Sequence, residues 1–160
     1  MDLQERVINQ FHEHMGCAAY SAEHLPQDIA IAAQMLHQCF LQEGKILICG
    51  NGANAANGHH LSAALLSRFK QERPSLPAFN LAADSTTMSA VIRDSSFQDV
   101  FAKQITALGQ QGDIVVVTTI DRLFSSYKSA QEMLAVWKRA GIRLFVAGMG
   151  EVTAENLNYF

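Results

Sequence analysis

The segment from Lys45 to His60 constrains the fold of this chain more than any other. It opens with the apolar run Ile46–Cys49, which is too short for a helix and typical of a fully buried strand in a parallel sheet. The turn Gly50-Asn51-Gly52 follows, and glycine lets the backbone bend sharply and approach a ligand closely. A helix-spaced apolar stretch, Leu61–Leu66, comes next. The segment therefore predicts a strand, a glycine turn and a helix N-terminus in direct succession.

A helix that starts directly after such a turn is suited to binding an anion. Its first N–H groups lack partners within the helix, and the helix dipole favours negative charge at this end. A phosphate group fits both requirements. The same kind of turn also serves as a plain connection in α/β proteins, so the local pattern leaves both interpretations open.

Three further segments have the composition of strands and alternate with helical segments. They are 78–82, 113–119 and 142–148, and the β-branched run Ile114–Val117 is the clearest of them. Strands separated by helices of ten to fifteen residues indicate crossover connections, and hence an α/β fold with a parallel sheet covered by helices.

Two amphipathic helices are expected before the first strand, over 2–24 and from Pro26 to about Gly44. They lie outside a minimal α/β unit, so their apolar faces need a partner. The first helix has near-heptad spacing, which is typical of packing between subunits. Packing on the sheet of the same chain is the alternative, and the pattern does not separate the two.

Composition bounds the class of protein. The 160 residues are enough for one domain with a substantial core, and the net charge of −3 excludes a basic nucleic-acid footprint over the whole domain. Cys17, Cys39 and Cys49 are odd in number and widely spaced, as expected of free thiols in a reducing cytosol. No apolar run could span a membrane and no secretory signal is visible. We expect a cytoplasmic protein without a metal or cofactor.

The predicted strand ends carry the candidate site. The junctions Gly50–Asn54, Asp84–Thr87 and Thr118–Ser126 each follow a strand, and the carboxyl ends of parallel strands share one edge of a sheet. A glycine turn and several hydroxyl groups would converge there. These residues make a phosphorylated small molecule the leading class of ligand.

Several motifs, in order along the chain, resemble the sugar isomerase (SIS) domain family. The first is Cys49-Gly50-Asn51-Gly52 with Asn54-Ala55-Ala56 and His60. The others are Glu72-Arg73-Pro74-Ser75-Leu76-Pro77-Ala78, Val100-Phe101-Ala102-Lys103-Gln104, Ala107-Leu108-Gly109 and Gly112-Asp113. The match is to the branch that holds phosphoheptose isomerase and the DnaA initiator-associating proteins (DiaA), and the proline-marked loop is closest to the DiaA form.

The resemblance implies a three-layer αβα sandwich with a parallel, flavodoxin-like sheet, and N-terminal helices that help to build a homotetramer. It divides the chain into a helical pair, 1–44, and an SIS core, 45–160, which lacks the family's usual C-terminal strand and helix. It also implies phosphosugar binding at the strand-end loops. The residues that we assign to this binding are Gly50, Asn51, Gly52, Ala53, Asn54, His60, Asp84, Ser85, Thr118, Thr119, Ser125 and Ser126.

Departures from the family pattern decide the functional expectation. The isomerase carries paired glutamates where this chain has Ala63 and Ala64, and alanine cannot act as the base that proton abstraction requires. The loop Thr118–Ser126 also has no glycine and contains Asp121, whose charge would repel a phosphate.

We therefore expect a non-catalytic, DiaA-type protein that binds the initiator DnaA and promotes replication initiation, without contacting nucleic acid or membrane directly. The alternatives are a phosphoheptose isomerase acting on sedoheptulose 7-phosphate, and a phosphosugar-sensing module without DnaA contact.

Overall fold

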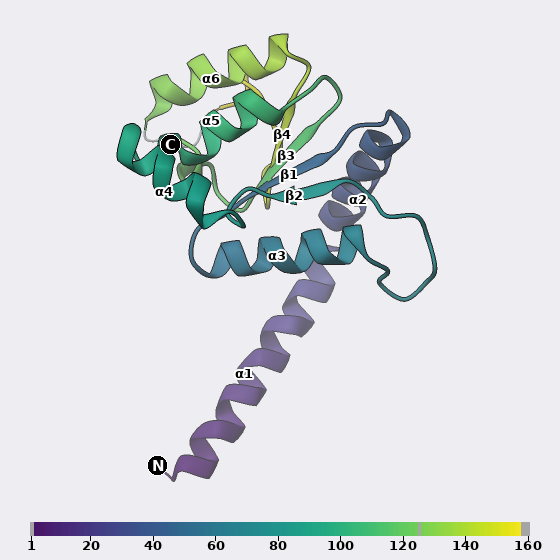
Figure 1. Ribbon diagram of the computed structural model, residues 1–160. Coiled ribbons are helices and arrows are strands. Elements are labelled where there is room, and N and C mark those ends of the chain that lie inside the picture. Colours follow the sequence, from purple (N-terminus) through teal and green to yellow (C-terminus); the bar gives the residue numbers. More distant parts are fainter. Residues whose placement is uncertain (1, 125, 158–160) are drawn as a thin grey trace. The chain divides into compact units, whose positions relative to one another are not determined.

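The computed structural model describes residues 2–124 and 126–157 and divides the chain into two compact units, residues 1–34 and 35–160 (Figure 1). The helices are α1 Leu3–His24, α2 Pro26–Leu41, α3 Ala53–Leu66, α4 Ser85–Asp94, α5 Asp99–Leu108 and α6 Tyr127–Arg139, with a 3₁₀ turn at Ile120–Arg122. The strands are β1 Ile46–Cys49, β2 Ala78–Asn80, β3 Ile114–Val117, β4 Arg143–Val146 and β5 Gly150–Val152. The sequence predicts a domain boundary between residues 44 and 45, and this boundary remains a prediction.

The strands form one sheet in the order β2-β1-β3-β4-β5. The first four are parallel, as expected, whereas β5 runs antiparallel beside β4. This is the flavodoxin-like order, in which β1 has the next two strands of the chain on its two sides. The chain therefore leaves β1 in one direction for β2 and returns on the other side for β3. A crevice opens at such a switch point, beyond the carboxyl ends of the two central strands.

Helices cover both faces of the sheet (Figure 1). Its side chains point alternately to the two faces and are buried in two core clusters. On one face Leu47, Val115 and Leu144 pack with residues of α5 and α6, including the fully buried Phe101 and Trp137. On the other face the buried side chains are Cys39, Ile46, Ile48, Ala78 and Ile114, with parts of α2 and α3 packed against them. The predicted three-layer α/β sandwich is confirmed.

A buried ion pair joins the strands β1 and β3 at the end opposite the crevice. Asp113 is 1% exposed, and its Oδ2 lies 2.6 Å from Lys45 Nζ. The carboxylate also accepts from the backbone N–H of Lys45 at 2.9 Å and of Gln110 at 2.7 Å. The Lys45 ammonium and the two N–H groups together compensate the cost of burying this carboxylate. The same contacts hold the two strands that carry the site in register.

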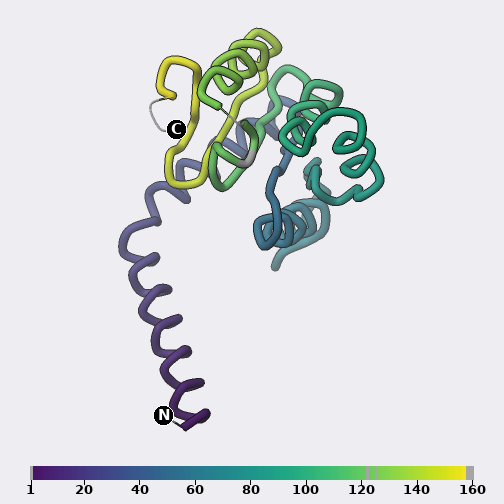
Figure 2. Tube along the Cα trace, turned by 90° about the vertical axis from the view of Figure 1, so that its left-hand side faces the viewer, coloured from purple at the N-terminus to yellow at the C-terminus, as the bar shows by residue number. Residues whose placement is uncertain are grey.

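Helix α1 is a single unbroken helix (Figure 2). Its apolar stripe is exposed, with Leu3 at 77%, Phe11 at 66% and Met15 at 57%. The stripe agrees with the predicted amphipathic pattern. The surface on which it packs, in this chain or in another subunit, remains a prediction. None of the helices in the described part of the chain is both long and apolar enough to cross a bilayer.

Candidate functional site

The turn between β1 and α3 has the geometry that its glycines predict. A Cβ on Gly50 would lie 2.8 Å from the carbonyl carbon and oxygen of Asn54, so only glycine fits there. Gly52 has φ +56° and precedes the first residue of α3. Because glycine has no side chain, α3 begins without a side-chain cap. The N–H groups of Asn54 and Ala55 donate to the carbonyls of Asn51 at 3.1 Å and Gly52 at 3.0 Å. Among the described residues this leaves the N–H of Ala53 at the helix start for an external acceptor such as an anion.

Two buried oxygen atoms without partners flank this turn. Asn51 Oδ1 and Thr118 Oγ1 have no hydrogen-bond partner among the described residues. Cys49 pairs with Val117 in the parallel register, so the residues that follow these two strands lie side by side at the carboxyl edge. A buried polar atom without a partner is costly and calls for an explanation. A ligand with both acceptor oxygens and hydroxyl donors would satisfy the threonine hydroxyl and the asparagine oxygen.

Two other predicted site residues serve as helix caps. Asp84 accepts from the backbone N–H groups of Thr86 at 2.9 Å and Thr87 at 3.1 Å, and from the Thr87 hydroxyl at 2.5 Å. The Thr87 hydroxyl is the main cause that lowers the pKa of Asp84, followed by these N–H groups. Ser126 caps α6 in the same manner, through the N–H of Ser129 at 3.2 Å. The N-termini of α4 and α6 are thus already capped by their own side chains, in contrast to α3.

The loop after β3 is anchored by bulky side chains. Ile120, Leu123 and Phe124 are buried in the core, and residues 120–122 form a 3₁₀ turn. The described part of this loop is therefore held in place by the packing of its side chains in the core. Thr119 is exposed beside it, while the predicted site residue Ser125 lies outside the described residues.

The remaining predicted residues lie on α3 and at the start of α4. Ala53 and Asn54 form the first turn of α3, Ser85 opens α4, and His60 is exposed about 10 Å further along α3. The structure therefore brings together the residues from Gly50 to Asn54 with Thr118 and Thr119. It does not bring His60 into this cluster.

Asn80 is a positioning residue that sequence reasoning missed. It ends β2, and its Nδ2 donates to the carbonyl of Ala55 at 3.0 Å while its Oδ1 accepts from Ala82 N–H at 3.1 Å. It also packs on Gly58, where a Cβ would lie 3.2 Å from the amide. These contacts hold the first turns of α3 against β2. The sequence feature that could have indicated this role is an amide side chain at the end of an apolar strand.

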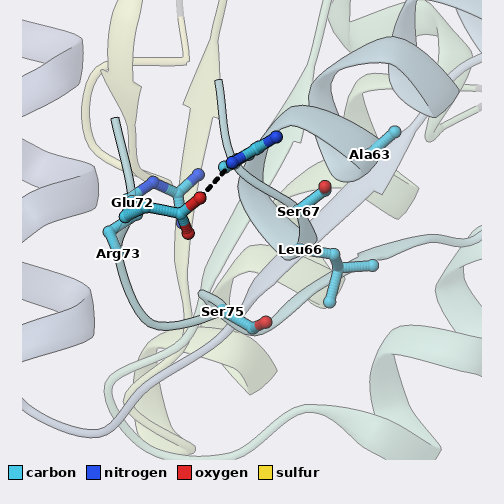
Figure 3. A pocket seen from close by; sticks show the side chains of 7 residues that line it. Ala63, Leu66, Ser67, Glu72, Arg73 and Ser75 are labelled. Atoms are coloured by element: carbon cyan, nitrogen blue, oxygen red, sulfur yellow. Dashed lines mark hydrogen bonds and ion pairs between the residues drawn. The ribbon is translucent and has the colours of Figure 1, made fainter. Parts of the chain in front are cut away.

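A second hollow lies at the other end of α3 (Figure 3). Its volume is about 550 Å³, and it is lined by Ala63, Leu66, Ser67, Arg68, Glu72, Arg73 and Ser75. The Arg73 guanidinium donates to the carbonyls of Ala64 and Leu65, and so caps the helix C-terminus. Arg68 forms an ion pair with Glu72. The charged groups here are paired or engaged with the backbone, so they are not the anion site that the sequence predicts.

Comparison with known proteins places the chain in a family. The model of the SIS domain matches residues 12–122, which is more than half of the sequence. The chain belongs to the SIS domain family. A phosphoheptose isomerase of Chromohalobacter salexigens is 47% identical over 116 residues, which are 72% of this chain and 59% of that protein. The phosphoheptose isomerase of Laribacter hongkongensis is 38% identical over 149 residues, or 88% of this chain and 76% of the relative.

Solved structures give the same result. The phosphoheptose isomerase of Neisseria gonorrhoeae superimposes with a TM-score of 0.74 at 31% identity, over 91% of this chain and 74% of that one. That of Francisella tularensis gives a TM-score of 0.76 at 30% identity, over 94% and 78%. The SIS fold is therefore confirmed. The chain spans about three fifths of the length of the Chromohalobacter relative.

The expectation of a DiaA-type protein that binds DnaA is wrong. It depended on Ala63, Ala64 and the proline-marked loop, which are few positions in one part of the chain. The relatives described above are phosphoheptose isomerases, and the identity that they share with this chain extends over more than 110 residues. Similarity over that length outweighs two small residues on one helix.

Proposed function

We propose that this SIS domain binds a sugar phosphate and acts as a phosphoheptose isomerase, converting sedoheptulose 7-phosphate to its aldose isomer. The observation that carries the proposal is the N-terminus of α3, which has no side-chain cap and is flanked by the unpaired oxygens Asn51 Oδ1 and Thr118 Oγ1. The names of the relatives supply the substrate class.

The chemistry of binding follows from the groups at the crevice. The N–H of Ala53 at the start of α3 would donate to a phosphate oxygen, helped by the positive end of the helix dipole. The Thr118 hydroxyl would donate to an oxygen of the ligand. Asn51 Oδ1 is an acceptor, so its natural partner is a hydroxyl of the sugar and not the phosphate.

The isomerisation itself requires a base that removes a proton from C1 and returns it to C2. Ala63 and Ala64 on α3 offer no such group. The base must therefore come from another part of the protein or from a second copy of it. The two alanines also favour a second candidate function, in which the domain binds a sugar phosphate without converting it.

The experiment that separates these functions is a nuclear magnetic resonance assay of the purified protein with sedoheptulose 7-phosphate in deuterium oxide. An isomerase produces aldose signals and incorporates deuterium at C2, since the proton on the base exchanges with solvent. Line broadening of the substrate signals without either change would support binding alone. Substrate spectra identical to those without protein would contradict both functions.

A further inference from the structure

The strand β5 forms one edge of the sheet, and a side chain occupies its outer side. In the described part of the chain β5 pairs with β4 alone, so its other side faces away from the sheet. An edge strand offers unpaired N–H and C=O groups to any further strand, and natural proteins block such edges with short strands, proline or charge. At the opposite edge of this sheet, Pro77 directly precedes the three residues of β2.

Asn156 makes two hydrogen bonds to the backbone of β5 and of the residue after it. Its Oδ1 accepts from the N–H of Thr153 at 2.7 Å, and its Nδ2 donates to the carbonyl of Glu151 at 2.9 Å. The first bond follows the capping-box pattern, in which a side chain three residues further on accepts from the N–H of a threonine. The second bond lies outside that pattern and reaches back to the strand.

A further strand would take the same two backbone groups. In a parallel ladder, one residue donates to the carbonyl before the residue that it faces and accepts from the N–H after it. For a strand that faces Val152, these groups are the carbonyl of Glu151 and the N–H of Thr153. The side-chain amide of Asn156 therefore stands where the backbone of a further strand would lie.

The segment that carries Asn156 is anchored at several points. Val152 and Leu157, on either side of it, are buried in the core at 4% and 1% exposure. Glu155 forms an ion pair with Lys138 of α6. Asn156 itself is exposed, so burial does not fix its side chain. The anchors bring the amide to the edge of β5, and the two hydrogen bonds hold it there.

We infer that Asn156 closes the outer edge of β5 against a second copy of this chain. Without the amide, two β5 strands can pair antiparallel about a twofold axis at Val152, because the N–H of Thr153 in each copy then meets the carbonyl of Glu151 in the other. Arg143 neutralises the Glu151 carboxylate, so this charge offers little repulsion between the copies. The inference does not depend on the proposed function.

Two measurements on Asn156→Ala test the inference. Amide hydrogen exchange of dilute protein, followed by nuclear magnetic resonance, reports the bond at Thr153. We expect its N–H to exchange at least tenfold faster in the variant than in the wild type, because its acceptor is removed. Light scattering after size-exclusion chromatography reports association. We expect the mass of the variant to rise with concentration to at least twice that of the wild type.

Asn156→Lys separates an opened edge from a destabilised fold. Lysine also lacks an acceptor for the N–H of Thr153, so exchange should accelerate as in the alanine variant, but its charge on the edge should keep the mass at the wild-type value. The control Gln38→Ala, at an exposed position of α2, should change neither measurement. Unchanged exchange or unchanged mass in Asn156→Ala, or an equal rise in mass in Asn156→Lys, would overturn the inference.

Discussion

At the scale of single residues, the site depends on Gly50. Its missing side chain lets the backbone of Asn54 approach, since a Cβ would lie 2.8 Å from two backbone atoms that cannot move independently of α3. Sequence reasoning identified this position because glycine directly after a buried strand is a specific signal. For Asp84 it left helix capping and ligand contact both open, since the same side chain can do either, and it assigned Ser126 to the ligand, whereas both residues cap helices.

We expect Gly50→Ala to destabilise the protein by about 1–3 kcal/mol, the cost of forcing an extra methyl group into a packed site. Urea unfolding measures this change. The matched control is Gly16→Ala on α1, where a Cβ has no atom within 4 Å, and this substitution should stabilise by roughly 0.5–1 kcal/mol. Equal stability of the Gly50 variant and the wild type would contradict the close approach.

At the scale of secondary-structure elements, most of the fold could be predicted. Each of the four parallel strands is an apolar run between turns, and periodicity located the helices. The antiparallel strand β5 was missed, because its three residues, Gly150–Val152, are too few for any pattern. Its pairing depends on tertiary contacts, which include the burial of Val152 in the core and a bidentate ion pair of Arg143 and Glu151, with both N–O distances 2.8 Å.

This ion pair predicts a pH dependence. The hydrogen bonds from Arg143 lower the pKa of Glu151, so the folded state holds its charged form more strongly than the unfolded state does. The resulting stabilisation is present above the unfolded pKa, about 4.3, and is lost as the pH falls through the lower folded pKa. Because both side chains are more than a third exposed, we expect it to be only about 0.5 kcal/mol.

Urea unfolding at pH 6 and pH 3 checks this dependence with Glu151→Gln. The variant should lose less stability on acidification than the wild type. Glu132→Gln on the exposed side of α6 is the control and should behave as the wild type does. An identical acid-induced loss in all three proteins would show that the pair contributes nothing.

At the scale of the whole molecule, we propose that α1 mediates self-association into the homotetramer that the family resemblance implies, since its near-heptad spacing is typical of packing between subunits. The apolar residues Ile8, Phe11, Met15, Ala18 and Ala22 recur at alternating steps of three and four residues, the spacing of a coiled-coil seam. All five are solvent-exposed. An exposed apolar stripe of this length is typical of an interaction surface.

Light scattering after size-exclusion chromatography tests the proposal. We expect the wild type to be larger than a monomer and Phe11→Glu to shift toward smaller species, because it places a charge in the seam. Asn9→Glu puts the same charge on the opposite side of α1 and should leave the mass unchanged. A monomeric wild type, or a Phe11→Glu variant of unchanged mass, would contradict a role for α1.

The central claim is that the N-terminus of α3 binds the phosphate of a sugar phosphate. Calorimetric titration of Ala53→Asp and Ala53→Asn with sedoheptulose 7-phosphate tests it most directly, because the two variants differ in charge alone at the first, exposed residue of the helix. A carboxylate at this position interacts favourably with the helix dipole, but it repels the phosphate of the ligand. We predict that the asparagine variant binds within a fewfold of the wild type and that the aspartate variant binds at least tenfold more weakly. Equal affinity of the two variants would contradict the claim.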